Sequence, residues 1–148
     1  MPSTSISRPM PVRSAADALF LLGLAAQEPL APATYTFFLD RDGVGGVITE
    51  VSGGAAPDSV LHIVGIMASA AQNVDHAELL VVATVRPDGS VLPGDADRWS
   101  AASEICSAHG ITLVEWFVIS PHGVASPRTL LGEPERWSFT RQHDVAPG

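Results

Sequence analysis

Three positions in the segment 84–97 have the spacing of a zinc site, but only one of them carries a residue that binds zinc. Catalytic zinc can be held by a His-x-His pair and, at a fixed distance along the chain, an aspartate, because two imidazoles and one carboxylate leave a coordination position open for water. Here the corresponding residues are Thr84, Arg86 and Asp97. The segment therefore has the frame of a metal site without two of its three ligands.

Arg86 changes the chemistry of this segment most. Its guanidinium group is permanently charged, so it repels a metal ion and pairs with carboxylates instead. We expect Arg86 to pair with Asp97 or Glu50 and to fill the space that a metal would occupy. Two interpretations of Asp97 stay open: a carboxylate retained in a pocket, or an ordinary acidic residue at the start of a helix. For Glu50, a solvent-facing residue at the end of a strand is the simpler interpretation.

The elements around this segment follow from the hydrophobic pattern. Residues 78–85 are nearly all apolar and largely β-branched, which is typical of a strand buried on both faces of a sheet. The candidate loop leaves the end of this strand and leads into a helix over about 96–109, which Gly110 ends. The remaining pattern predicts a helix over 14–26, strands of a hairpin over 34–39 and 44–51, a buried helix over 57–70 and a strand over 111–120.

The order α-β-β-α-β-α-β predicts a single α/β domain in which helices sandwich a mixed β-sheet. A chain of 148 residues is long enough to bury such a core without disulfides. We assign this domain to residues 12–131. Residues 1–11, rich in Ser, Thr and Pro, are expected to form a disordered tail. Residues 132–148 are expected to be weakly ordered, with Trp137 able to dock onto the core.

With these elements in place, residues 34–126 resemble a JAB/MPN (JAMM) metalloprotease-like domain, in particular its RadC-like bacterial branch. The resemblance rests on Leu39 and Asp40 at the end of one strand, on Glu50 in the next, and on the Pro, Gly, Pro and Asp positions of the segment 86–97. The strand over 110–119 is also similar to the family's strand at that place. The resemblance implies a JAB/MPN-like fold with cytidine-deaminase-like layering.

The same resemblance implies a role for each residue of the degenerate motif. Thr84 and Arg86 stand where the two metal-binding histidines would be, and Asp97 stands where the carboxylate ligand would be. Glu50 lies near the position of the general acid/base, and Gly94 replaces the serine that would orient the reacting species. Glu50, Thr84, Arg86 and Asp97 are therefore candidates for a remnant site, and we assign no catalytic residue, metal ligand or cofactor.

The missing ligands favour a non-catalytic domain, a pseudoenzyme that acts through protein–protein contacts, either with a protein partner or as a homodimer, because this fold often pairs. Two alternatives stay open. One is a divergent metal-dependent hydrolase or isopeptidase with non-standard ligands, such as Asp97, Glu50 and the histidine His122. The other is a small-ligand-binding or regulatory domain of actinobacterial type, since residues 13–17 open the chain in a way that is similar to a second family, one of unknown function.

Charge and hydropathy disfavour several partners. The formal net charge is −8, and all eight basic residues are arginines scattered along the chain, so we expect no nucleic-acid binding. The apolar stretches are too short and too interrupted to span a membrane. The first residues lack the pattern of a signal peptide, and we therefore expect a cytoplasmic protein without membrane contacts.

A few single residues have a predicted environment. Cys106, the only cysteine, leaves no disulfide within the chain and no cysteine-based zinc site, and it is expected to be buried. His62 lies on a largely apolar helix and is expected in the core. The strongest candidates for a contact surface are the tryptophans Trp99, Trp116 and Trp137.

Overall fold

The computed structural model describes residues 11–25, 31–52 and 56–137. In chain order its elements are helix α1 (Ala15–Ala25), strands β1 (Ala33–Leu39) and β2 (Gly45–Ser52), helix α2 (Ser59–Ala70), the 3₁₀ turn η1 (Ala71–Asn73), strand β3 (Leu79–Val85), helix α3 (Asp95–Ala108), strands β4 (Thr112–Ser120) and β5 (Gly123–Ala125), and the 3₁₀ helix η2 (Pro127–Leu131). The strands form one sheet in the order β2-β1-β3-β4-β5. Only β3 and β4 run parallel among these neighbours. The predicted α/β fold with a mixed sheet is confirmed.

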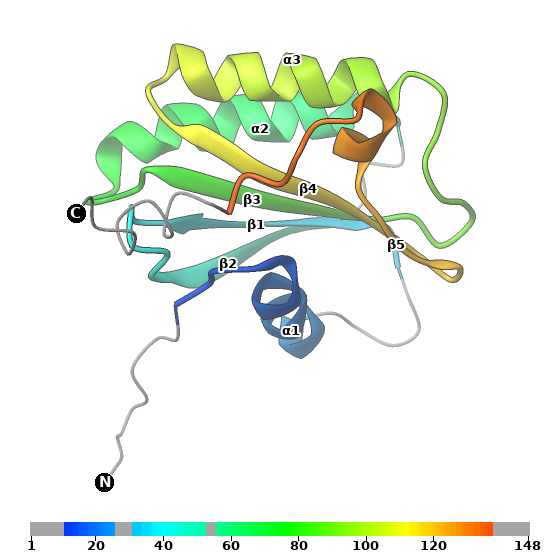
Figure 1. Ribbon diagram of the computed structural model, residues 1–148, viewed down its shortest axis with the longest axis horizontal. Helices are drawn as coiled ribbons and strands as arrows, with labels where there is room; N and C mark the ends of the chain where they lie inside the picture. The colour runs from blue at the N-terminus through cyan, green and yellow to red at the C-terminus, as the bar shows by residue number, and fades with distance from the viewer. Residues whose placement is uncertain (1–10, 26–30, 53–55, 138–148) are drawn as a thin grey trace, which may run out of the picture.

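Helices cover both faces of the sheet (Figure 1). Helices α2 and α3 lie side by side over one face, and α1 packs against the other. Strand β3 is central to this arrangement, since its side chains alternate between two hydrophobic cores. Those on the α1 side are Leu79, Val81, Ala83 and Val85, and those under α2 and α3 are Leu80 and Val82. The nearly continuous apolar run over 78–85 thus reflects burial on both faces.

Strand β4 is connected to the segment after it by β5 and by a buried ion pair. Strand β5 pairs only with residues 118–120, and a bulge shifts the β4 register between Leu113 and Glu115. Glu115 is 1% exposed, and its carboxylate accepts hydrogen bonds from the backbone N–H of Trp116 (3.0 Å), from Ser126 Oγ (2.5 Å) and from Arg128 Nε (3.0 Å). An ion pair therefore holds η2 against β4 at a residue that does not pair with β5.

Several expectations about single residues are corrected by the packing. His62 is exposed rather than in the core, because α2 buries only the side that carries Val60, Ile63, Val64 and Ala68. The tryptophans do not form a contact surface: Trp99 and Trp116 are fully buried and Trp137 is 6% exposed. Cys106 is buried, as predicted, and this burial raises the pKa of its thiol to about 12.

The two predicted tails are described only in part. Residues 1–10 and 138–148 lie outside the described residues, whereas the segment 132–137 follows η2. In that segment Arg136 lies over the ring of Trp99, 4.6 Å from its centroid, and Trp137 packs into the α1-side core. Among the described residues no helix is both long enough and apolar enough to cross a membrane.

Candidate functional site

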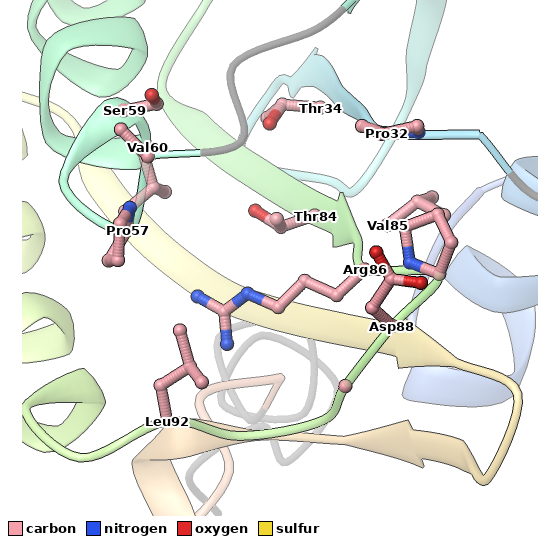
Figure 2. A pocket seen from close by; sticks show the side chains of 13 residues that line it. Pro32, Thr34, Pro57, Ser59, Val60, Thr84, Val85, Arg86, Asp88 and Leu92 are labelled. Carbon is pink, nitrogen blue, oxygen red and sulfur yellow. The ribbon is translucent and has the colours of Figure 1, made fainter.

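The candidate loop connects the carboxyl end of β3 to the start of α3 (Figures 1 and 2). Arg86 opens the loop, and its backbone N–H donates to the carbonyl of Ile119 in β4 at 2.8 Å. Gly94 closes the loop with a φ of +89°, a left-handed conformation that glycine adopts without strain. A Cβ atom at this position would lie 3.3 Å from Arg98 Nη1. The glycine therefore allows the Arg98 guanidinium to fold back over the start of the helix.

Arg86 forms a two-pronged ion pair with Asp95. Its Nη1 donates to Asp95 Oδ2 at 2.7 Å and its Nη2 to Asp95 Oδ1 at 3.2 Å. Nη1 also donates to the carbonyl of Ser90, and the guanidinium lies 5.7 Å from the centroid of the Trp116 ring. The side chain of Arg86 is only 13% exposed and that of Asp95 is 0% exposed. A pair with this geometry and burial fixes the direction of both side chains.

Asp95 is the centre of a wider network. Besides Arg86, its carboxylate accepts the backbone N–H of Leu92 at 2.7 Å and Arg98 Nη1 at 2.8 Å. Burial acts to raise the pKa of Asp95, but the hydrogen bonds from Arg86, Leu92 and Arg98 outweigh burial and lower this pKa below its ordinary value. Arg98 also donates through Nε to Asp58 at 2.8 Å, just before α2. One carboxylate thus connects the end of β3, the loop and the starts of α2 and α3.

The predicted pairing of Arg86 with Asp97 or Glu50 is wrong. Its partner is Asp95, and Asp97 is exposed in the first turn of α3. Residues two apart on an α-helix point about 200° away from each other, so only one of the two aspartates can face Arg86. Of the two open interpretations of Asp97, the acidic residue at the start of a helix is the one that the structure shows.

Glu50 lies on the opposite face of the sheet from Thr84. It is exposed on β2 directly opposite Tyr35 of β1, and Tyr35 belongs to the core on the α1 side. Directly opposed residues of an antiparallel pair share a face of the sheet. Burial, followed by the charge of Glu50 and a hydrogen bond with it, raises the pKa of Tyr35. The structure therefore brings Thr84 and Arg86 together and leaves Glu50 and Asp97 apart from them.

A cavity of about 220 Å³ opens beside Arg86, between the neighbouring ends of β1 and β3 and the start of α2 (Figure 2). We call it the α2–β3 cavity. Its lining includes the paired residues Thr34 and Thr84 of the two strands, the side chain of Arg86, and apolar residues such as Val60 and Leu92. Thr84 Oγ1 accepts a hydrogen bond from Trp116 Nε1 at 2.9 Å. The position expected to carry a metal-binding histidine therefore holds a hydroxyl group bonded to the core.

The donor groups of this region do not fit a zinc ion. Arg86 adds a positive charge, and its carboxylate partner already accepts four hydrogen bonds. In the ranges 11–25, 31–52 and 56–137, no three side chains of His, Cys, Asp or Glu gather as a metal site would require. The three residues suggested for a divergent site, Asp97, Glu50 and His122, are all exposed and lie on α3, on β2 and in the β4–β5 turn.

Three residues of this site, Asp95, Thr34 and Trp116, are not among the positions that the spacing of a zinc site indicates. For Asp95 a local signal exists, because an acidic residue three positions before Arg98 on a predicted helix is spaced for an ion pair. Thr34 and Trp116 reach the site through the pairing of β1 and β4 with β3, and no local pattern reports that pairing. No protein-family model matches the chain, and no curated protein matches it either.

Proposed function

We propose that this chain is a non-catalytic JAB/MPN-like domain, a cytoplasmic pseudoenzyme that acts by pairing with a second copy of itself. The observation that carries the proposal is the ion pair of Arg86 with Asp95. It lies in the segment whose spacing is that of a zinc site, and it places a fixed cation where a metal ligand would be needed. Within the described ranges no three His, Cys, Asp or Glu side chains gather in a group, which argues against zinc binding and against the activation of a water molecule by a metal.

The ion pair also supplies the connection that a metal would make. A bound ion would join the end of β3 to the start of α3, and Arg86 with Asp95 joins the same two elements directly. Arg98 extends the connection to Asp58 before α2. A guanidinium keeps its protons at physiological pH, so Arg86 cannot act as a general base. The loop is therefore organised without acid–base or metal chemistry at its centre.

Strand β2 offers the contact surface. It is the last strand of the sheet, and among the described residues no strand pairs with its outer edge. Val47 is 81% exposed and Val51 is 38% exposed. The strand is eight residues long and contains neither lysine nor proline, the residues that commonly protect an edge from pairing. Its one charged residue, Glu50, points to the other face of the sheet from Val47 and Val51.

A second copy of β2 is the occupant that this edge fits. In an antiparallel pair with a two-fold axis at Thr49, Val47 of one copy faces Val51 of the other, and Ile48 faces Glu50. Like charges do not oppose one another in this register. A groove of about 520 Å³, lined in part by Phe38, Val47 and Val74, continues the apolar surface beside the strand. The pairing would join two sheets of five strands into one of ten.

Replacing Val47 with lysine is expected to convert the dimer into a monomer, because a lysine on an edge strand has to be desolvated when strands pair. Light scattering coupled to size-exclusion chromatography measures the molar mass. The matched control is Val124→Lys on β5, at the other edge of the sheet, where the valine is 49% exposed. We expect the control to stay dimeric. A monomeric wild-type protein at micromolar concentration, or a dimeric Val47→Lys variant, would contradict the proposed contact.

A further inference from the structure

The α2–β3 cavity has the composition of a small-molecule site. Figure 2 shows residues from two strands, the loop and the start of α2 around one space, with the side chain of Arg86 extending toward α2. Its walls are mostly apolar and include Pro57, Val60 and Leu92. A volume of about 220 Å³ accommodates about ten non-hydrogen atoms at the packing density of a protein interior. Sites with apolar walls and a few polar groups are typical of small ligands.

Two hydroxyl groups lie next to each other in this cavity. Thr34 and Thr84 are directly opposed on β1 and β3, so their side chains share one face of the sheet. Thr84 Oγ1 accepts from Trp116 Nε1, which leaves its own proton free to be donated. Thr34 is only 2% exposed, and it lines the cavity, where its hydroxyl can donate to a ligand atom.

Arg86 adds donors to the same cavity without adding net charge. A guanidinium has five N–H groups, and three hydrogen bonds from Arg86 are made inside the protein, to Ser90 and Asp95. Its Nε–H and one N–H of Nη2 therefore remain for a ligand. The positive charge is balanced by Asp95, and the carboxylate of Asp88 also lines the cavity. The polar side of the cavity thus offers hydrogen-bond donors in surroundings that repel an anion.

We propose that the α2–β3 cavity binds a small neutral molecule whose apolar body carries a carbonyl oxygen, such as a carboxamide. The carbonyl oxygen accepts one hydrogen bond from the hydroxyl of Thr34 and one from the hydroxyl of Thr84, and the side chain of Arg86 lines the same cavity. The apolar body lies against Pro57, Val60 and Leu92. A carboxylate of the same shape is rejected, because it places a second anion near Asp88 and Asp95. None of the residues that line the cavity belongs to β2, so ligand binding and the proposed dimer contact are tested on different residues.

Benzamide and benzoate are suitable probes because they have the same body and differ in charge. We expect benzamide to shift the backbone amide signals of Thr34, Thr84 and Arg86 in ¹H,¹⁵N correlation spectra of the full chain. The dissociation constant is expected on the order of 1 mM, as the ligand has few atoms. Benzoate should bind about tenfold more weakly or not at all, because two carboxylates lie near the site. Equal or tighter binding of benzoate, an absence of shifts with benzamide, or shifts confined to another surface would overturn the proposal.

The variant Thr34→Val tests the hydroxyl directly. It keeps the shape and removes the hydroxyl, and we expect benzamide binding to weaken about tenfold. The matched control is Thr36→Val, two residues along β1 on the same face. The hydroxyl of Thr36 is buried without a partner and lies outside the cavity. The control should bind benzamide as the wild type does. Unchanged benzamide affinity in Thr34→Val would overturn the assignment. If that variant does not fold, the comparison of benzamide with benzoate on the wild-type protein decides whether the cavity binds a neutral carbonyl compound.

Discussion

Replacing Asp95 with alanine is expected to lower the free energy of unfolding by about 3 kcal/mol, since it leaves two poorly hydrated arginines without their shared partner. Arg86 and Arg98 are 13% and 17% exposed, and the Leu92 N–H loses its acceptor as well. For a chain of this size the melting temperature should fall by about 10 °C. Thermal and urea unfolding followed by circular dichroism measure both quantities.

Asp97 provides the matched control for this prediction. It lies in the same turn of α3 but is exposed, so Asp97→Ala should cost only about 0.5 kcal/mol, through the lost interaction with the helix dipole. Equal losses for the two variants would contradict the central position of Asp95. The two aspartates lie in one turn and share a chemical type, so a difference between them reports burial and ion pairing alone.

The contribution of Asp95 should also depend on pH. Its pKa is lowered in the folded state relative to the ordinary value of 3.8, which means that the folded state favours the charged form. The stabilisation is therefore fully present above pH 3.8 and is lost as the pH falls through the folded-state pKa. We expect the difference in stability between the wild type and Asp95→Asn to be constant near neutral pH and to shrink in acid.

Replacing Glu115 with alanine is expected to destabilise the fold by about 3–4 kcal/mol. The carboxylate is 1% exposed and is the acceptor for Ser126, for Arg128 and for the backbone of Trp116. Arg128 is itself 7% exposed and would lose its ionic partner. Since this pair holds η2 against β4, the loss should be accompanied by faster amide hydrogen exchange at residues 113–117.

The surface pair of Glu78 with Arg41 serves as the control for Glu115. Their side chains are 38% and 68% exposed, so Glu78→Ala should cost no more than about 0.5 kcal/mol. Replacing both Glu115 and Arg128 with apolar residues of similar volume should restore much of the stability, because neither charge is then left buried alone. If Glu115→Ala lowered the free energy of unfolding as little as Glu78→Ala does, the buried pair would not contribute to the stability of the fold.

Most of the fold follows from local patterns in the sequence. The apolar run before Arg86 predicts a strand buried on both faces, and β3 is the central strand with two cores. The hairpin of β1 and β2 follows from strand-forming residues on either side of the turn at Asp40–Gly43. For β3 and for the hairpin, the residues that set the local structure are close together in the sequence, so the pattern can be read without knowing the tertiary contacts.

The site is less predictable, because its contacts join distant segments. The choice between Asp95 and Asp97 depends on how α3 is rotated against β3, which no spacing within the loop reports. The apolar character of the segment 57–70 predicts His62 in the core, but α2 covers the sheet with only one side and leaves His62 exposed. Glu115 stands in an apolar strand, and its partner Arg128 comes from η2 after a turn and a further strand. The partner of Arg86, the exposure of His62 and the pairing of Glu115 with Arg128 are all decided by tertiary packing.

In the proposed function, the pair of Arg86 with Asp95 organises residues 84–97, and the segment binds no zinc ion. The most direct test is the metal content of the wild-type protein, measured by plasma mass spectrometry after dialysis against excess zinc and removal of the unbound metal. We predict zinc far below one ion per chain and the same content in Asp97→Ala. One zinc ion per chain, lost on Asp97→Ala, would contradict the account.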